Sequence, residues 1–475
     1  MLKSKKMDSF AIHFFIFFIE LYMHVFLFFI HKLNLIILKT NMTETKNIKW
    51  CAIQPLTGGM YLGAEKAIGH RAEFIISFPG IADVSKVNKE TGEVVACGNE
   101  YHLLKYLEKK NDLPDYRVFN RAMFDASEST DVELLEHDKW SQTSGPLDYS
   151  DMDICIAVPV CSGLSTVTVG DAEMRATRNC NMMFIARYAM NVIRPKVYVF
   201  ENAPAVTTGA GATVRSQLED IAAKAGYSVS YYKTDTRLHD NCQTRKRTFI
   251  YFYRHDTADV EYPPTLQWEN IQPDFDEFMS RIPADASLQN ETMDISGTGQ
   301  AMIKYLNEKV HATDWHEKSK TPCQYIIKEN LVNDFLDYSD TLDIPEKVHA
   351  RIHRYVNHCV EKLHDNKGYW DITPFKFKKN RVGAIMFRTM QYGLHPNEDR
   401  LLNMRECLHF MGHPADFELQ GDYKTTFRQI GQNVPVRTAQ WIVSEAIRTM
   451  DLRGQFGNES NVRAFDNINQ KEMTL

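Results

Sequence analysis

Between residues 50 and 253, short apolar runs alternate with helix-like segments, and this alternation constrains the fold more than any other feature of the chain. A strand that is followed by a helix and then by another strand usually returns parallel to the first, with the helix packed on a face of the sheet. We therefore predict an α/β fold in which a largely parallel sheet carries helices on both faces. At 475 residues, the chain is long enough for a second domain.

One apolar run, Asp153 to Ser165 (DICIAVPVCSGLS), ends in a cysteine. Its apolar residues indicate a buried strand, and Ser162-Gly163 indicates a loop. Cys161 is therefore expected at the carboxyl end of a strand, where open parallel sheets place their chemistry. Taken alone, a free cysteine is more often a small buried apolar residue than a nucleophile.

Two later segments change that balance. The first, residues 196–204 (KVYVFENAP), contains a second apolar run that ends at Glu201-Asn202. The second, residues 241–253 (NCQTRKRTFIYFY), has Gln243, Arg245 and Arg247 at alternate positions where a strand begins. With these residues, the chain resembles the DNA cytosine-5 methyltransferases, whose signature is a Pro-Cys loop, a Glu-Asn-Val strand end and a Gln-x-Arg-x-Arg strand in this order. The resemblance runs from about residue 50 to about residue 448. It implies a Rossmann-like sheet that uses S-adenosyl-L-methionine, and a smaller mixed target-recognition domain.

The resemblance also implies how the residues act on double-stranded DNA. The target cytosine is flipped out of the duplex, the Cys161 thiolate adds at carbon 6, Glu201 supplies a proton at nitrogen 3, and Arg245 stabilises charge on the ring carbonyl. Carbon 5 is then methylated. Further residues expected at the substrate are Ser165, Asn202, Gln243 and Arg247.

The cysteine loop departs from the family pattern. Val160 and Ser162 stand where the family has Pro and often Gln, and Pro159 comes one place early. We still predict an active enzyme of a restriction-modification pair or of a phage. A tRNA cytosine-5 methyltransferase and a catalytically silent DNA-binding relative remain alternatives.

A glycine turn at Gly58-Gly59 precedes the expected helix 60–68, and such a turn allows a ligand to approach the backbone closely. An ordinary tight turn explains two glycines equally well. The family motif here is Phe-x-Gly-x-Gly-Gly, with Gln54 and Leu56 in place of Phe and the first Gly. Glu100 is expected to bind the ribose hydroxyls and Asp125 the adenine amino group, with helix caps as the alternative. The cofactor residues implied are Thr57, Gly58, Gly59, Glu100, Asp125, Val160, Gln432 and Asn433.

The segment 369–388 interleaves aromatic residues with cations, which along a strand would form one basic face suited to phosphates. We predict DNA contacts at Lys376, Lys378 and Arg381; a solvated edge strand is the alternative. Near the carboxyl end, segments 394–419 and 427–443 resemble the last two blocks of the family. The first contains Arg405-Glu406, expected as a joint between domains, and the second precedes a helix that returns to the cofactor domain.

The net charge of −6 and a pI near 6.3 mean that a surface for nucleic acid must be local. Nine scattered cysteines without a CxxC pair argue against a disulfide framework or a zinc ribbon, so we predict no metal site. His349 and His353 are interpreted as surface residues. The expected compartment is the reducing cytoplasm of a bacterium or of a phage-infected host cell. We expect a monomer, with a cognate restriction endonuclease as a further partner.

The apolar run Phe10 to Ile30 could span a bilayer by its length, but Glu20 would then be buried without an evident partner. No small-residue cleavage site for a signal peptide follows it. We favour Met42 as the true start and expect no membrane association. The predicted divisions are an N-terminal extension (1–41), a cofactor-binding and catalytic domain (42–254), a target-recognition domain (255–394), a returning C-terminal segment (395–450) and a polar tail (451–475).

Overall fold

The computed structural model divides into two compact units, 1–48 and 49–475, and every element below belongs to the second. The structure describes residues 48–78, 81–119, 134–135, 146–159, 164, 172–257, 266–267, 269–286, 289–291, 294–364, 373–379 and 382–450. The proposed extension 1–41 and the tail 451–475 lie outside these residues.

Eight strands of the described chain form the central sheet, in the order β6-β5-β2-β1-β7-β8-β11-β9. Strands β5, β2, β1, β7 and β8 run parallel, whereas β11 runs antiparallel to both its neighbours and β6 antiparallel to β5. The prediction of a largely parallel sheet is confirmed. The strands are β1 (Trp50–Ile53), β2 (Phe74–Ser77), β5 (Asp115–Phe119), β6 (Leu134–Leu135), β7 (Ile154–Ala157), β8 (Val197–Asn202), β9 (Tyr227–Asp235) and β11 (Lys246–Arg254).

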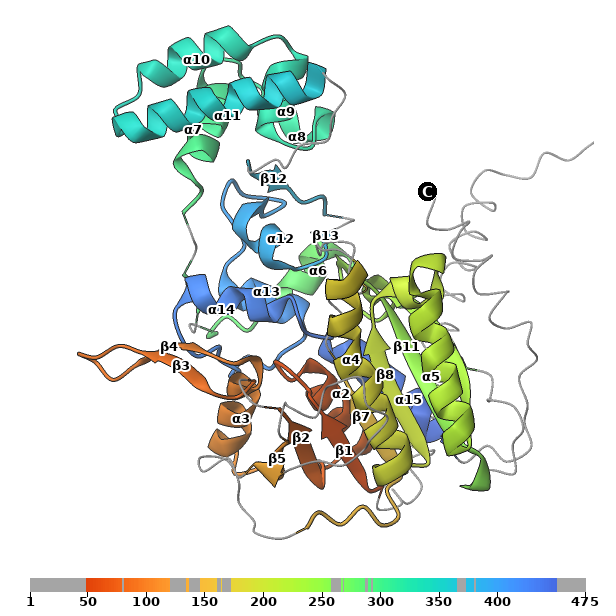
Figure 1. Cartoon of the computed structure of the whole chain (residues 1–475). Helices are drawn as coiled ribbons and strands as arrows, with labels where there is room; N and C mark the ends of the chain where they lie inside the picture. Colours follow the sequence, from red (N-terminus) through yellow and green to blue (C-terminus); the bar gives the residue numbers. More distant parts are fainter. Residues whose placement is uncertain are drawn as a thin grey trace, which may run out of the picture. The chain divides into compact units, whose positions relative to one another are not determined.

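Helices cover both faces of this sheet (Figure 1). On one face, α4 (Ala172–Tyr188) contacts α5 (Ala212–Ala225), and on the other α2 (Gly59–Ile68) packs along α15 (Val436–Met450). Every residue of β1, β2, β7 and β8 is buried, as expected for strands covered on both faces. The Tyr251 hydroxyl of β11 donates to the Ile442 carbonyl of α15 at 2.9 Å. Helix α15 thus returns from the C-terminal part of the chain to pack on α2 and on the central sheet.

The sequence predicts a hairpin in which the runs 73–78 and 93–96 flank a turn at 88–92. A hairpin does join β2 to α3 (Asn99–Lys109), but its first strand is a different one. The turn at 88–92 is present, closed by a bond from the Asn88 amide to the Glu93 carbonyl. It joins β3 (Val84–Val87) to β4 (Val94–Cys97), and the run 73–78 belongs to the central sheet instead. The sequence could not distinguish the two because β3 is short and exposed, whereas β2 is fully buried.

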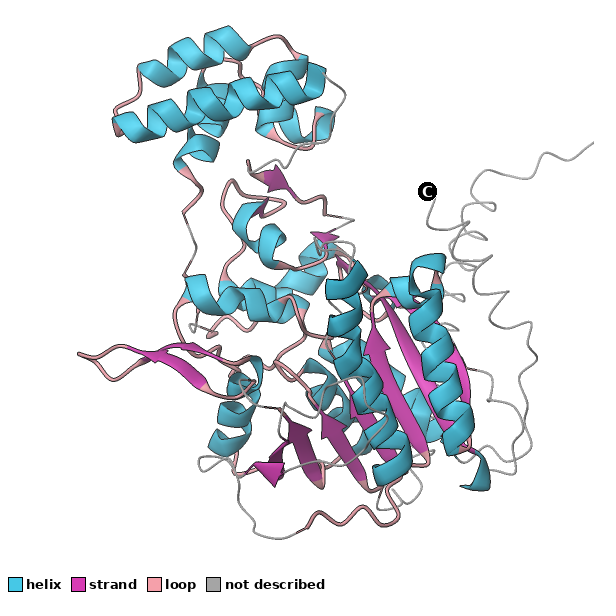
Figure 2. Cartoon of the chain, in the orientation of Figure 1, coloured by secondary structure: helices cyan, strands magenta, loops and turns pink. Residues whose placement is uncertain are grey.

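After the short helices η6 (His255–Thr257) and α6 (Phe275–Ser280), residues 297–364 are mainly helical (Figure 2). Helices α7 (Gly297–Glu308), α8 (Trp315–Lys318), α9 (Pro322–Lys328), α10 (Val332–Asp340) and α11 (Glu346–His364) surround a core that includes Met302, Trp315, Phe335 and Val356. No helix among the described residues has the length and hydropathy needed to cross a bilayer.

The remaining elements are short, and they contradict one continuous strand in 369–388. Within the described part of that segment, β12 (Phe375–Lys376) pairs with β14 (Gly393–Leu394), and β13 (Val382–Gly383) pairs with β10 (Gln243–Thr244). Because β12 and β13 belong to different sheets, the cations do not alternate along one strand. Three helices complete the chain: α12 (Phe387–Tyr392), α13 (Met404–Phe410) and α14 (Tyr423–Ile430).

Candidate active site

The carboxyl ends of β1, β7 and β8 meet at one edge of the sheet. Ile53 pairs with Ala157, and Ala157 pairs with Phe200. Glu201 is the next residue of β8, so the end of β7 lies beside it. Cys161, Val160 and Ser165 fall outside the described residues, and the run that leads to them is described as far as Pro159, which is buried.

Glu201 forms an ion pair with Arg247 at this edge. The Arg247 Nε lies 2.7 Å from the Glu201 Oε1, and the side chains are 17% and 4% exposed. A carboxylate taken out of water this far needs a partner of opposite charge. The pair therefore fixes both groups beside the end of β7.

Arg245 faces a different part of the chain. Its Nη1 donates to the Ile385 carbonyl at 3.3 Å and its Nη2 to the Gly431 carbonyl at 2.8 Å. The structure thus pairs Arg247 with Glu201, whereas the sequence assigned the ring carbonyl of cytosine to Arg245. The alternation of Gln243, Arg245 and Arg247 along the sequence does not predict this difference, because the strand partners change between β10 and β11. Strand β10 pairs with β13, whereas β11 pairs with β8 and β9.

Asn202 and Gln243 are buried and engaged in protein contacts. The Asn202 Oδ1 accepts from the Ala203 amide at 2.8 Å, and its Nδ2 lies 3.5 Å from the Met182 sulfur. Gln243 accepts from the Ile385 amide at 2.9 Å and donates to the Phe410 carbonyl at 3.1 Å. Both residues therefore hold the strand ends in place.

The glycine turn is closely packed against the C-terminal segment. The Gly59 amide donates to the Asn433 Oδ1 at 2.8 Å, and the Thr57 hydroxyl donates to the Gln429 carbonyl at 3.1 Å. A Cβ atom on Gly59 would lie 1.8 Å from the Val434 carbonyl oxygen. Gln432 is nearby, where its Oε1 accepts from the Asn99 side chain. Glycine is thus required at position 59 by the returning chain itself.

Gly58 adopts a left-handed conformation with φ of 97°, and Leu56 does so with φ of 54°. An L-residue pays roughly 1–2 kcal/mol for this conformation. The backbone at Leu56 therefore has the left-handed conformation that the first glycine of the family motif would adopt without strain.

Two buried side chains, Gln54 directly after β1 and Glu100 in the first turn of α3, each have an oxygen without a hydrogen-bond partner among the described residues. Glu100 is fully buried, and its Oε1 has no hydrogen-bond partner among the described residues, while its Oε2 accepts from the Tyr116 hydroxyl at 3.2 Å. Burial raises the pKa of Glu100 to about 8, although Ser77, Tyr116 and the Leu56 amide partly oppose this.

Gln54 is 1% exposed, and its Oε1 also lacks a partner within the described chain. The Gln54 amide donates to the Ile76 carbonyl at 2.8 Å, which places this residue where β1 and β2 end. An unsatisfied buried polar group costs about 1–3 kcal/mol, so both oxygens indicate a ligand with hydrogen-bond donors. We expected Glu100 at this site and overlooked Gln54, whose signal was a polar residue directly after a fully apolar strand. Asp125 lies outside the described residues.

The lysines predicted to contact DNA are paired with carboxylates of the same chain. Lys376 lies 2.9 Å from Asp399 and its side chain is 11% exposed, while Lys378 lies 3.4 Å from Glu317. Arg381 falls outside the described residues. These lysines would have to exchange their partners to bind phosphate.

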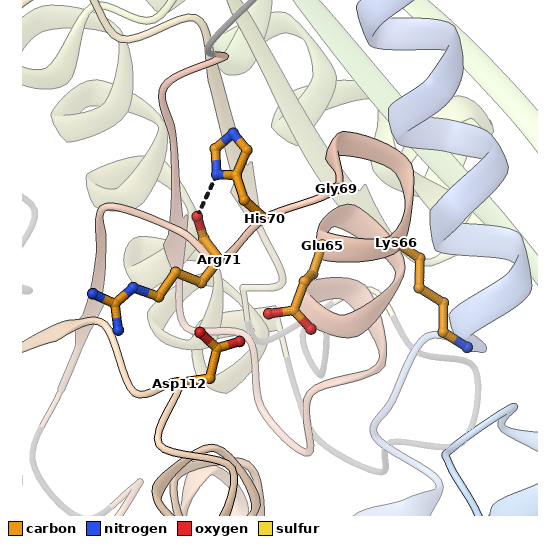
Figure 3. Close-up of a pocket in the computed structure, with 6 residues that line it drawn as sticks. All are labelled: Glu65, Lys66, Gly69, His70, Arg71 and Asp112. Atoms are coloured by element: carbon orange, nitrogen blue, oxygen red, sulfur yellow. Dashed lines mark hydrogen bonds between the residues drawn. The ribbon is translucent and has the colours of Figure 1, made fainter. Parts of the chain in front are cut away.

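A cavity of about 540 Å³ lies at the opposite edge of the sheet, where α2 ends before β2 and α3 ends before β5 (Figure 3). The carboxylates of Glu65 and Asp112 face each other there. Burial and the neighbouring Asp112 carboxyl raise the pKa of Glu65 to about 7. None of the residues predicted from the sequence lines this cavity, so the candidate site is the carboxyl edge. The cavity is lined by Glu65, Lys66, Gly69, His70, Arg71 and Asp112.

Known proteins share part of this sequence. DNA (cytosine-5)-methyltransferase 3 of Arabidopsis thaliana is 21% identical over 316 residues, which cover 60% of this chain and 22% of that one. Type II methyltransferase M.Bpa9945I of Bacillus paralicheniformis is 22% identical over 326 residues, covering 61% and 69%. Type II methyltransferase M1.HphI of Haemophilus parahaemolyticus is 21% identical over 341 residues, covering 72% and 77%. The chain thus spans about a fifth of the plant relative's length.

Among solved structures, the chain is similar to the Entamoeba histolytica methyltransferase EhMeth, with a TM-score of 0.46, 9% identity and coverage of 86% of this chain and 100% of that one. The S. pombe Dnmt2 methyltransferase gives a TM-score of 0.43 at 10% identity, with the same coverage. Structural similarities with TM-scores this low carry no argument about function. The model of the C-5 cytosine-specific DNA methylase family matches residues 119–448, a region that starts after the glycine turn and Glu100. Since this region is most of the chain, the protein belongs to the C-5 cytosine-specific DNA methylase family.

Proposed function

We propose that the protein is an S-adenosyl-L-methionine-dependent methyltransferase that modifies carbon 5 of cytosine in double-stranded DNA. The observation that carries the proposal is the buried Glu201–Arg247 ion pair beside the end of β7, the strand that leads to Cys161. In a chain of this family, a carboxyl group and a guanidinium at that place match the two needs of a cytosine ring under attack.

The residues at the ends of β1 and β2 fit the proposed cofactor. The unsatisfied oxygens of Glu100 and Gln54 are acceptors, and a nucleoside offers hydroxyl and amino donors to them. Gly58 and Thr57 shape the neighbouring turn. S-adenosyl-L-methionine, when bound, supplies an electrophilic methyl group. Asp125 and Val160 stay predicted contacts, whereas Gln432 and Asn433 would act by holding the turn.

Cys161 acts as the nucleophile in this proposal. Its thiolate forms a bond to carbon 6, and the ring electrons shift to carbon 5, which becomes nucleophilic. Glu201 in its acid form donates a hydrogen bond or a proton at nitrogen 3, and Arg247 stabilises the negative charge at the ring carbonyl. Carbon 5 would then take the methyl group as S-adenosylhomocysteine leaves. Transfer of the carbon 5 proton to water would expel the thiolate from carbon 6 and restore the aromatic ring.

The chemistry requires a base that has left the double helix. Residues of 255–394 would hold the DNA, with Lys376, Lys378 and Arg381 at its phosphates and Ser165 near the flipped base. Contacts of these lysines with phosphates would make binding weaken as salt is added, and each lysine would first have to leave its carboxylate partner. A role in restriction-modification, or in protecting a phage genome, is consistent with the type II names of two relatives.

The proposal is tested with labelled S-adenosyl-L-methionine and genomic DNA, comparing the full chain with its Cys161→Ala variant. We expect label at carbon 5 of cytosine in one short motif, mapped by bisulfite sequencing, and no label with the variant. A covalent complex with duplex DNA containing 5-fluorocytosine is the second expected result. Label on tRNA alone, or cofactor binding without any transfer, would refute the proposal in favour of the tRNA enzyme or the silent binder.

A further inference from the structure

Resting on that proposed function, we propose that Gln243 and Arg245 are positioning residues that couple recognition of the DNA sequence to the Glu201–Arg247 pair. They form a clamp on the backbone of Ile385, in what we call the recognition segment, residues 382–386. The clamp is defined as these two side chains and the groups that they bind.

The two side chains hold Ile385 from both of its backbone groups. The Ile385 amide donates to the Gln243 Oε1 at 2.9 Å, and the Arg245 Nη1 donates to the Ile385 carbonyl at 3.3 Å. The same stretch is paired with β10 through Gln243↔Val382 and Thr244↔Gly383. Backbone pairing and side-chain bonds together fix the recognition segment on the strand that precedes β11.

The other end of each clamp side chain reaches the C-terminal part of the chain. The Gln243 Nε2 donates to the Phe410 carbonyl at 3.1 Å, and the Arg245 Nη2 donates to the Gly431 carbonyl at 2.8 Å. Gln243 is fully buried and Arg245 is 2% exposed, so water does not easily replace these bonds. The two side chains thus join their own strand to the recognition segment and to the C-terminal residues Phe410 and Gly431.

Arg247 is only two residues beyond Arg245, and its guanidinium pairs with Glu201. A shift of the recognition segment would pull on Gln243 and Arg245, and the strand that carries them also carries Arg247. Correct DNA in the recognition domain would therefore place the segment, the clamp and Arg247 together. Mismatched DNA would leave Arg247 displaced from the ring carbonyl.

The test compares Gln243→Leu, Gln243→Glu and Arg245→Lys with the wild type. Gln243→Glu still accepts from the Ile385 amide but no longer donates to the Phe410 carbonyl. This variant therefore tests the bond to Phe410 separately from the bond to Ile385. Glu269→Gln is the matched control, since it weakens the buried contacts of Glu269 with Arg437 and His239 and does not touch residues 382–386. Each protein is tested as the full chain after its thermal unfolding has been measured.

The first readout is hydrogen exchange in the peptide that contains the Ile385 amide. We expect exchange there to accelerate about tenfold in Gln243→Leu, the factor for one lost buried hydrogen bond, and to change little in Gln243→Glu and in the control. Unchanged exchange in Gln243→Leu would show that the clamp does not hold the segment.

The second readout is discrimination, the ratio of kcat/KM on a cognate duplex to that on a duplex with one changed base pair. We expect this ratio to fall about tenfold in Gln243→Leu and Arg245→Lys, with the Kd for S-adenosylhomocysteine within about twofold of wild type by calorimetry. Equal losses on both duplexes, or a parallel loss of cofactor affinity, would overturn the coupling and leave a merely structural role. A wild type that methylates no DNA would instead refute the proposed function, and the exchange at Ile385 would still decide whether the clamp exists.

Discussion

At the scale of single residues, the two arginines of the Gln-x-Arg-x-Arg stretch are expected to behave differently. Arg247 pairs with Glu201, so Arg247→Lys, which keeps the charge but loses the planar fork, should lower kcat about 100-fold on cognate DNA at an unchanged cofactor Kd. Arg245→Lys should lower kcat far less, because Arg245 binds carbonyl groups of the chain. Single-turnover rates on one duplex check this, and the reverse order of the two losses would restore the role that the sequence assigned to Arg245.

Glu100 offers a prediction in which stability and binding move in opposite directions. Burial raises its pKa from 4.5 to about 8, so the folded protein holds a proton that the unfolded chain releases, and folding becomes less favourable as the pH rises from about 4.5 to 8. Glu100→Gln removes this cost, and we expect it to be more stable than wild type by a few kcal/mol at pH 8 and nearly equal below pH 5.

The same variant should bind S-adenosylhomocysteine at least tenfold more weakly at pH 8, where wild-type Glu100 can release its proton and its carboxylate accepts hydrogen bonds more strongly than a neutral amide does. Urea unfolding at the two pH values and calorimetric titration check both parts. Equal stability at pH 8 would mean that Glu100 has another partner, outside the residues described.

At the scale of elements, the contact between α2 and α15 depends on glycine. A Cβ atom on Gly59 would meet the Val434 carbonyl at 1.8 Å, and one on Gly63 would meet the Ala439 Cβ at 2.4 Å. Gly59→Ala and Gly63→Ala are each expected to cost about 3 kcal/mol or more. Gly69→Ala is the control: open space surrounds it, and its φ of 96° limits the cost to about 1–2 kcal/mol. Denaturant midpoints rank the three, and equal losses would contradict the close packing.

The elements also show which predictions the sequence supports. Strands β1, β7 and β8 could be predicted because every residue is buried, so each reads as an unbroken apolar run before a polar break. The same logic found Glu201 at a strand end. It does not reveal the partners of Arg245, where the chain leaves one sheet for another, or the short strand β3, which is mostly exposed. Neither the change of partner nor the carbonyl groups that receive Arg245 leave a local trace in the sequence.

At the scale of the whole molecule, two buried histidines limit stability in acid. Burial lowers the pKa of His102 and of His413 from 6.5 to about 4, although the Gln429 side-chain oxygen and the Thr57 carbonyl, which accept hydrogen bonds from the two rings, act the other way. The unfolded chain takes up these protons first, so the contribution of the two histidines to stability is complete above about pH 6.5 and is lost as the pH falls toward 4. We expect that contribution to fall by several kcal/mol over this range, and by less in His102→Gln. Melting temperatures at half-unit steps of pH check this; identical slopes for the two proteins would exclude His102 as a source.

The packing of α15 on α2 also has a consequence for folding during synthesis on the ribosome. Helix α2 is synthesised well before the surface that packs against Gly59 and Gly63, because Gly59 bonds to Asn433, which lies 374 positions later in the chain, and Val434 and α15 follow it. Contacts between such distant segments form slowly, because the intervening chain must first be brought together. The face of α2 that packs on α15 would thus stay uncovered until the 374 positions between Gly59 and Asn433 have been synthesised. A chaperone that shields α2 from other nascent chains would be most valuable in that interval.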